Sequence, residues 1–226
     1  MTPLRVFIGY DSRESIAHHA LAHSILRRAS IPVSITPLAL NQLGSIYKRV
    51  RGPTESTEFS LTRFLVPYLS GYEGVSLFMD CDMLCRVDVA ALLNEGVDKR
   101  SDKSVFVCQH DYTPKSETKF LGQRQTKYPR KNWSSLMMFR NDRCRELTPG
   151  YVNSVSGLEL HRFAWLKDED IGSLPLEWNF LVGEKNQSPE PPKILHFTNG
   201  GPWIPGYEDV DYAPLWRIER GHMLGK

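Results

Sequence analysis

Long hydrophobic runs are missing from this sequence of 226 residues, as are internal repeats and low-complexity tracts. No stretch approaches the roughly 20 apolar residues that a membrane-spanning helix requires. The apolar run within "MTPLRVFIGY" is also far shorter than the core of a signal peptide with its cleavage site. We therefore expect no transmembrane segment and a cytoplasmic location. With 41% hydrophobic and 24% charged residues, the composition is typical of a globular protein and excludes a disordered or fibrous class.

Cysteine is scarce, and its spacing excludes two common structural roles. The four cysteines are scattered and no secretory signal accompanies them, so we expect reduced thiols rather than a disulfide framework. Two of them lie close in sequence, but no second pair follows at the spacing of a structural zinc site. The cysteines are Cys81, Cys85, Cys108 and Cys144.

A strong excess of charge is missing too. The net charge of +2 is too small to indicate a nucleic-acid partner. Basic residues do concentrate in residues 115–131, where six Lys or Arg accompany one Glu. This segment is either a local basic patch or a solvated loop. The length suits one domain with a well-filled core.

Hydrophobic periodicity predicts alternating strands and helices. The order strand, helix, strand at the N-terminus is typical of a βαβ unit, so we predict an α/β domain with a mostly parallel sheet flanked by helices. On the first helix, His19 and His23 lie four residues apart, but they share their stripe with Arg27 and we expect a solvated face. The predicted strands are 4–11, 32–40, 75–79, 104–112, 133–141, 174–182 and 192–196, and the predicted helices are 12–30, 57–74, 87–96 and 156–166.

Two carboxylates stand where the apolar strand 75–79 ends. Asp80 and Asp82 are two positions apart in "GVSLFMDCDML", and like charges this close repel unless solvent, an arginine or a metal ion lies between them. Ligands bind beyond the carboxyl ends of strands in an open parallel sheet. The ends carrying Gly9, Tyr10 and Asp11, the aspartate pair, and His196 would meet at one such edge. The alternative is that the aspartates cap a turn and His196 is a buried imidazole.

Three motifs in this order resemble a known enzyme family. They are "LFMDCDML" after a strand, the upstream Arg-bearing "SLTRFLVPYL", and the downstream "HFTNGGPW". From the first strand to about Trp203 the chain resembles glycosyltransferases of the GT-A fold, and within them the family-8, glycogenin-like and galactosyltransferase-like, retaining enzymes. The resemblance implies a Rossmann-like single domain over 1–226. Residues 1–110 would form the nucleotide-binding part, and 111–226 the acceptor-binding part with the metal-ligand histidine.

The resemblance also implies a metal and a nucleotide-sugar site. Asp80, Asp82 and His196 would bind Mn²⁺, with Mg²⁺ as the alternative, and the ion would hold the donor diphosphate. The first-strand turn (Gly9, Tyr10, Asp11) would receive base and ribose. Cys81 would offer backbone contacts near the ribose, and Arg63 would lie near the donor sugar and diphosphate.

Two motifs depart from the family pattern. Gly201, which we also place at the nucleotide-sugar site, precedes Pro202 where the family has a phosphate-binding lysine. An Arg or Lys of 115–131 is the candidate replacement. In "NWSSLMMF", residues 133–135 replace the small residues that lie near the donor sugar in the family, so the sugar's identity does not carry over.

The acidic run in "LKDEDIGSLPLEWNFL" matches the family's catalytic segment. Asp168 would hydrogen-bond the donor sugar, Glu169 would face the anomeric carbon, and Asp170 is the third candidate. The alternative is a solvated acidic turn, because surface acids are the rule.

The expected activity is metal-dependent transfer of a sugar from a nucleotide-sugar, of the UDP class, to a hydroxyl of a glycan, a lipid-linked sugar or another acceptor. The acceptor would dock near Trp178, Trp203 and residues 115–131, unless both tryptophans are core. A nucleotidyltransferase would need a glycine-rich, lysine-containing loop after the first strand, and "GYDSRES" has neither feature. A sugar-binding protein without turnover is the third alternative.

Overall fold

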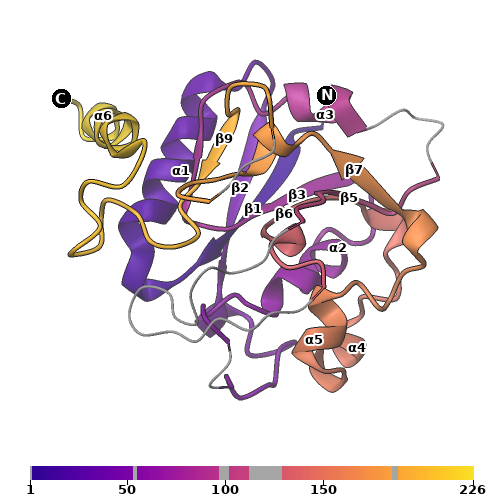
Figure 1. The fold of residues 1–226 in the computed structure, drawn as a ribbon. Coiled ribbons are helices and arrows are strands. Elements are labelled where there is room, and N and C mark those ends of the chain that lie inside the picture. The colour runs from indigo at the N-terminus through magenta and orange to yellow at the C-terminus, as the bar shows by residue number, and fades with distance from the viewer. Residues whose placement is uncertain (1, 53–54, 97–101, 112–128, 185–187) are drawn as a thin grey trace.

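The computed structural model describes residues 2–52, 55–96, 102–111, 129–184 and 188–226. Figure 1 shows a central sheet with α1 and α6 on one side and α2, α4 and α5 on the other. The strands are β1 Leu4–Tyr10, β2 Val33–Ala39, β3 Val75–Met79, β4 Met83–Cys85, β5 Val105–Cys108, β6 Leu136–Arg140, β7 Ile171–Leu174, β8 Phe180–Leu181 and β9 Ile194–His196. The helices are α1 Ser15–Arg28, α2 Val66–Leu69, α3 Ala91–Gly96, α4 Pro149–Ser154, α5 Gly157–His161 and α6 Ala213–Met223.

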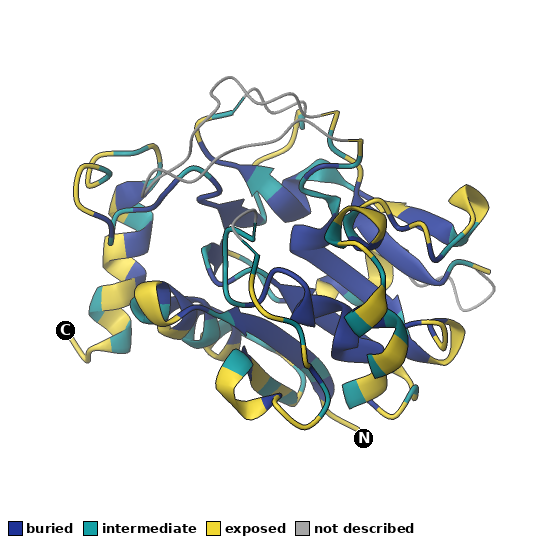
Figure 2. Ribbon diagram, turned by 90° about the horizontal axis from the view of Figure 1, so that it is seen from below, coloured by how far each residue is buried: buried dark blue, intermediate teal, exposed yellow. Residues whose placement is uncertain are grey.

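The main sheet has the order β2-β1-β3-β6-β5-β7. Strand β1 pairs in parallel with β2 and β3, and β5 pairs in parallel with β7, whereas β6 runs antiparallel to both of its neighbours. The predicted α/β fold with a mixed, mostly parallel sheet is therefore confirmed. Strands β1, β3 and β5 are almost entirely buried, which explains their continuous apolar runs, whereas the edge strand β2 exposes Ser34 and Thr36. Figure 2 shows the buried residues concentrated in these strands.

A second, small sheet has the order β4-β9-β8 and begins directly after the aspartate pair. Strand β4 was not predicted, because three residues carry too little periodicity to indicate a strand. Its antiparallel register with β9 places Met83 opposite His196. The peptide N–H of Phe197 also donates to the carbonyl of Asp82 at 2.9 Å. This pairing brings a histidine from the last third of the chain beside the two aspartates.

Several predicted elements differ from the structure in type or length. The predicted helix 156–166 is reduced to α5, and the predicted strand 133–141 begins with a 3-10 turn before β6. Residues 57–74 do not form one amphipathic helix. They contain a 3-10 turn, Thr62–Leu65, and the single-turn helix α2, with Pro67 in the first turn. Residues 174–182 are not one strand, because the 3-10 turn Leu176–Asn179 separates β7 from β8. Pro67 fits the first turn of α2 but would break a longer helix running through it, and Pro175 directly precedes the 3-10 turn that ends β7.

The C-terminal helix α6 was not predicted, and it changes the environment of α1. Glu219 of α6 is almost completely buried, and its carboxylate pairs with His23 at 2.6 Å and with Arg28 at 2.7 Å. The solvated face expected around His23 is therefore a helix-to-helix contact, whereas His19 is exposed. Within the described ranges, no helix is long and apolar enough to cross a membrane.

Candidate active site

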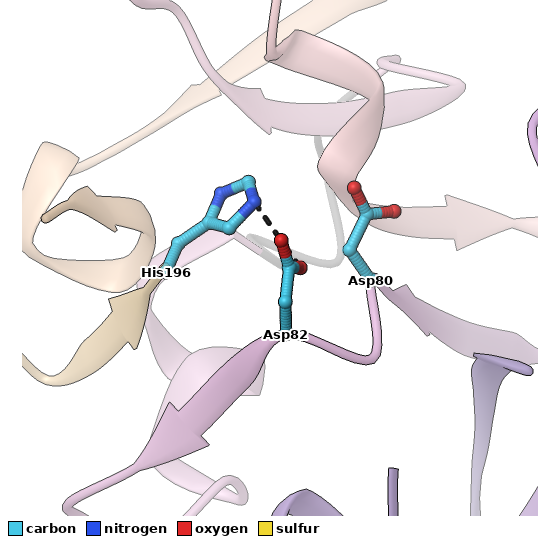
Figure 3. A group of neighbouring side chains, drawn as sticks. All are labelled: Asp80, Asp82 and His196. Carbon is cyan, nitrogen blue, oxygen red and sulfur yellow. Dashed lines mark ion pairs between the residues drawn. The ribbon is translucent and has the colours of Figure 1, made fainter. Parts of the chain in front are cut away.

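Asp80, Asp82 and His196 form one cluster in which each offers a ligand atom, and these atoms all lie within 4.8 Å of one another. Asp80 and Asp82 follow β3, whose carboxyl end faces the same edge as that of β1. Figure 3 shows the His196 ring, on β9, turned toward the Asp82 carboxylate, with Asp80 beside it. The distance from His196 Nε2 to Asp82 Oδ1 is 3.3 Å. The structure thus brings together the three residues predicted to bind a metal.

Arg63 lies on the other side of Asp80. Its Nη1 is 2.8 Å from Asp80 Oδ1 and donates to the carbonyl of Ser134 at 2.9 Å. The guanidinium lies over the rings of Phe59 and Phe78, at 5.2 and 4.9 Å from their centroids. Stacking and a directed hydrogen bond hold this cation in one place. The repulsion between the two aspartates was expected to be offset by solvent, an arginine or a metal ion. In the structure an arginine pairs with Asp80, and the imidazole of His196 lies beside Asp82.

The imidazole of His196 is oriented from behind by a residue to which the sequence assigned no role. Asn179 is fully buried, and its Oδ1 lies 2.8 Å from His196 Nδ1. Since Nδ1 faces an amide oxygen, Nε2 is the nitrogen available on the side of Asp82. The signal for Asn179 in the sequence was that it follows the acidic run within "LKDEDIGSLPLEWNFL".

The turn after β1 is already filled by contacts within the chain. A Cβ on Gly9 would lie 2.3 Å from the Phe59 ring, so glycine is required for this close packing. Tyr10 is half-buried and packs edge-to-face on His18 at 5.3 Å. Asp11 is fully buried. Its carboxylate accepts hydrogen bonds from the backbone N–H and guanidinium of Arg13 and from the backbone N–H of Glu58. Burial raises the pKa of Asp11, but the bonds from Arg13 outweigh it and lower the pKa.

Cys81 and Gly201 also lie in crowded surroundings. Cys81 is buried between the two aspartates, and burial together with the negative charge of Glu14 raises the pKa of its thiol well above the usual value. All four cysteines are free and buried. A Cβ on Gly201 would lie 2.1 Å from the Trp203 ring, which explains why a glycine stands before Pro202. The predicted nucleotide contacts of Cys81 and Gly201 stay predictions.

Glu14 is a second residue that the sequence did not single out. It is 2% exposed and accepts a hydrogen bond from Trp203 Nε1 at 3.1 Å. Burial, and next the negative charge of Asp82, raise the pKa of this carboxyl to about 8. A cation bound beside Asp82 would favour the ionised form of Glu14.

We expect this buried acid to make the metal-free protein less stable as the pH rises. The folded-state pKa of Glu14 is about 8, against an ordinary value of 4.5, so between these values only the folded protein holds the proton. The free energy of unfolding should then fall with rising pH over that window. Glu14→Gln keeps an acceptor for Trp203 and should flatten the decline, as measured by urea unfolding in EDTA at pH 5 and pH 8. The exposed Glu190→Gln is the control, and an unchanged slope in Glu14→Gln would contradict the expectation.

The three predicted catalytic acids lie away from the cluster. Asp168, Glu169 and Asp170 form a 3-10 turn just before β7, and the carbonyl of Asp170 accepts from the N–H of Ser104, just before β5. This is the amino end of these strands, opposite the edge where Asp80 and Asp82 lie. The Asp168 and Glu169 side chains are 85% and 75% exposed, and Asp168 pairs with Arg130. The structure does not bring these acids to the metal-ligand cluster, and their catalytic role stays a prediction.

The residues expected to contact the acceptor divide into two groups. Trp178 is fully buried beneath the Lys193 ammonium, which lies 4.8 Å from its ring centroid, so Trp178 is a core residue. Trp203 is half-buried and contacts Glu14. Most of the basic segment 115–131 lies outside the described residues. Of its described part, Arg130 lies over the Trp133 ring at 5.4 Å.

His110, just beyond the carboxyl end of β5, was also missed. Its Nε2 is buried and has no hydrogen-bond partner within the part of the chain that the structure describes. Burial, and then the neighbouring His196, lower the pKa of His110 to about 4, so the ring is neutral at pH 7. His110 fell inside the predicted strand 104–112, so nothing in the sequence marked it as a site residue; the observed strand ends at Cys108.

The comparison with known proteins gives one close relative. Protein CDI of Arabidopsis thaliana is 47% identical over 227 residues, which cover 96% of this chain and 86% of the relative. The chain belongs to the Protein CDI family. No family model matches the sequence.

Solved structures similar to this CDI-family chain are glycosyltransferases. They include the WbbM bifunctional glycosyltransferase (TM-score 0.66, 15% identity, 97% of this chain and 50% of that one). GlyE from Streptococcus pneumoniae TIGR4 has a TM-score of 0.64 and 14% identity over 100% of this chain and 63% of that one. The galactosyltransferase LgtC, solved with donor and acceptor sugar analogues, has a TM-score of 0.60 and 11% identity over 97% and 96% of the two chains.

The chain thus spans half the length of WbbM and under two thirds of GlyE, but nearly all of LgtC. At these identities the similarity establishes the fold, which is that of the GT-A glycosyltransferases. The predicted GT-A fold is therefore confirmed.

Proposed function

We propose that this chain is a metal-dependent glycosyltransferase that transfers a sugar from a nucleotide-sugar of the UDP class to the hydroxyl of a glycan, a lipid-linked sugar or another acceptor, with retention at the anomeric carbon. The observation that carries the proposal is the Asp80, Asp82 and His196 cluster at the carboxyl edge of a GT-A sheet. We also propose that residues 1–110 supply the nucleotide contacts and that residues 111–226 supply the acceptor surface and His196.

The donor set fits a hard divalent cation. Two carboxylates and one imidazole offer oxygen and nitrogen ligands within 4.8 Å of one another. Two ligand atoms on opposite sides of an ion, each bonded at about 2.0–2.5 Å, are about 4–5 Å apart, which matches the distances in the cluster. The imidazole favours Mn²⁺ over Mg²⁺, which takes oxygen ligands almost alone. The bound ion would act as a Lewis acid that neutralises the charge of the departing diphosphate.

The protein's own residues would orient the donor and hold charge in place. Arg63 is fixed by stacking and by Ser134, so its guanidinium needs little reorganisation to stabilise a nearby phosphate or sugar oxygen. Gly9, Tyr10 and Asp11 would receive the nucleotide base and ribose along the carboxyl end of β1. The rigid turn that Asp11 and Arg13 form would give this contact a fixed shape.

Measuring nucleoside diphosphate release tests the proposal directly. The full chain is incubated with a panel of UDP- and GDP-sugars in Mn²⁺ and in EDTA. Diphosphate release that requires Mn²⁺ supports glycosyl transfer. Binding without release indicates a sugar-binding protein, and release of pyrophosphate from nucleoside triphosphates with a sugar phosphate indicates a nucleotidyltransferase.

Three single substitutions test the acidic turn. If the carboxylate of Glu169 acts at the anomeric carbon, Glu169→Gln should lower turnover by about 10²-fold or more while donor binding persists. Asp168→Asn and Asp170→Asn are the matched variants. The turn lies at the far end of β7, so activity retained in all three would place the reacting centre at the Asp80 edge without them.

A further inference from the structure

A chain of three side chains ends at the candidate metal site. The carbonyl of Asn132 accepts a hydrogen bond from Ser135 Oγ at 2.6 Å. Asn179 Nδ2 donates to the same Ser135 oxygen at 2.8 Å, and Asn179 Oδ1 faces His196 Nδ1 at 2.8 Å. These groups come from the turn before β6, the turn before β8, and β9. Asn179 lies within "LKDEDIGSLPLEWNFL", but the sequence assigned neither Asn132, Ser135 nor Asn179 a role in metal binding.

One backbone carbonyl sets the direction of every hydrogen bond in this chain. A carbonyl can only accept, so the Ser135 hydroxyl donates its single hydrogen to Asn132. The Ser135 oxygen can then only accept from other groups. The side that Asn179 presents to Ser135 must then be its NH₂ group, and the amide oxygen must face His196. An amide oxygen cannot donate, so Nδ1 of His196 carries a proton. The neutral ring therefore has its lone pair on Nε2, which lies 3.3 Å from Asp82.

We propose that Asn179 is a positioning residue that, anchored by Ser135, fixes the tautomer and the ring orientation of His196 so that Nε2 is presented to a divalent cation held with Asp80 and Asp82. This inference rests on the proposed function, because it assigns a role within the same metal site. Groups that hold the outer nitrogen of a metal-binding histidine in this way typically change metal affinity by about 10- to 100-fold when removed.

The backbone of the turn that holds Ser135 also positions residues of the candidate metal site. Asn132 adopts a left-handed conformation, with φ of 67°, which turns its carbonyl toward Ser135 and Asn179. In the same turn, the peptide carbonyl of Ser135 accepts from the N–H of Asp80 at 2.9 Å. The same short turn therefore positions one metal-ligand candidate through its backbone and another through Asn179.

The first experiment needs no substitution. In ¹⁵N-labelled protein, the nitrogen chemical shifts of His196 report which ring nitrogen carries the proton. We expect a protonated Nδ1 and an unprotonated Nε2 in the metal-free protein at pH 8. The opposite tautomer would overturn the proposal, whatever the chain's activity.

The second experiment measures binding of Mn²⁺ alone, from the electron paramagnetic resonance signal of the free ion. Asn179→Leu removes the acceptor at similar volume and should weaken Mn²⁺ binding by about 10- to 100-fold. Asn179→Asp keeps an oxygen opposite Nδ1 and should restore most of the affinity. Asn153→Leu is the control, because Asn153 bonds to the backbone of Ile46 and Pro149 away from the cluster.

The outcomes separate this inference from the proposed function. Unchanged Mn²⁺ affinity in Asn179→Leu, or an equal loss in Asn179→Asp, would overturn the role of Asn179 while the metal site stands. If wild-type protein binds no Mn²⁺, the metal-dependent function fails, and the role of Asn179 in metal binding fails with it. If Asn179→Leu does not fold, Ser135→Ala, which removes only the anchor, should still shift the population of the two His196 tautomers. An unshifted population would then overturn the proposal.

Discussion

Nucleotide binding should lose its dependence on Mn²⁺ when Asp82 is replaced by asparagine. The substitution keeps the shape of the side chain but removes one of the two negative charges that a divalent cation would use. Titration calorimetry with a nucleoside diphosphate should show a loss of at least about 10-fold in Mn²⁺ and almost none in EDTA. Turnover should fall by roughly 10²–10³-fold, the size expected when a charge that stabilises a leaving group is lost.

Two controls show whether the loss of nucleotide binding is specific to the carboxylate of Asp82. Asp102→Asn removes a carboxylate that is 93% exposed and pairs with Arg143, and it should change neither value. Far-UV circular dichroism in EDTA should show that the Asp82→Asn protein is folded, because asparagine keeps the shape of the side chain. Equal losses of nucleotide affinity in Mn²⁺ and EDTA would rule out a metal site at Asp82.

Arg63→Met should cause the largest loss of stability of any substitution near the site. The side chains of Arg63 and Asp80 are 6% and 16% exposed, and removing one partner of such a buried pair typically costs about 3–5 kcal/mol. Methionine can still fill the space between Phe59 and Phe78, so the loss reports mainly on the charge. Urea unfolding in EDTA gives the free energy of unfolding for this comparison.

Two further proteins make the interpretation specific. In the double variant Arg63→Met with Asp80→Asn, both charges are absent and much of the stability should return. Arg143→Met, which breaks the exposed pair with Asp102, should cost about 0.5 kcal/mol or less. Mn²⁺ should also restore part of the stability of Arg63→Met, because a bound cation would replace the guanidinium beside Asp80. No recovery in the double variant would mean that Arg63 contributes through packing alone.

The sequence was sufficient for most strands of the main sheet and for the three ligand candidates. Strands β1, β3 and β9 are short apolar runs that end in polar residues, and local patterns of this kind depend only on neighbours along the chain. The aspartate pair after β3 and the histidine after "PKIL" could therefore be assigned before any contact was known. The same local patterns misled for residues 57–74 and 174–182, because prolines end regular hydrogen bonding without removing the apolar residues.

Only the tertiary structure decided which of these residues meet. The antiparallel register of β4 with β9 puts Met83 opposite His196, and no pattern within either segment specifies a pairing across more than 100 residues. Arg63, Glu14 and Asn179 likewise gain their roles from burial beside charges that are distant in sequence. The acidic residues Asp168, Glu169 and Asp170 match the family motif in residue type, but they lie at the opposite edge of the sheet. Residue types determine what chemistry is available, whereas distance and burial determine which groups act on one another, because electrostatic and hydrogen-bond energies depend on separation and on the exclusion of water.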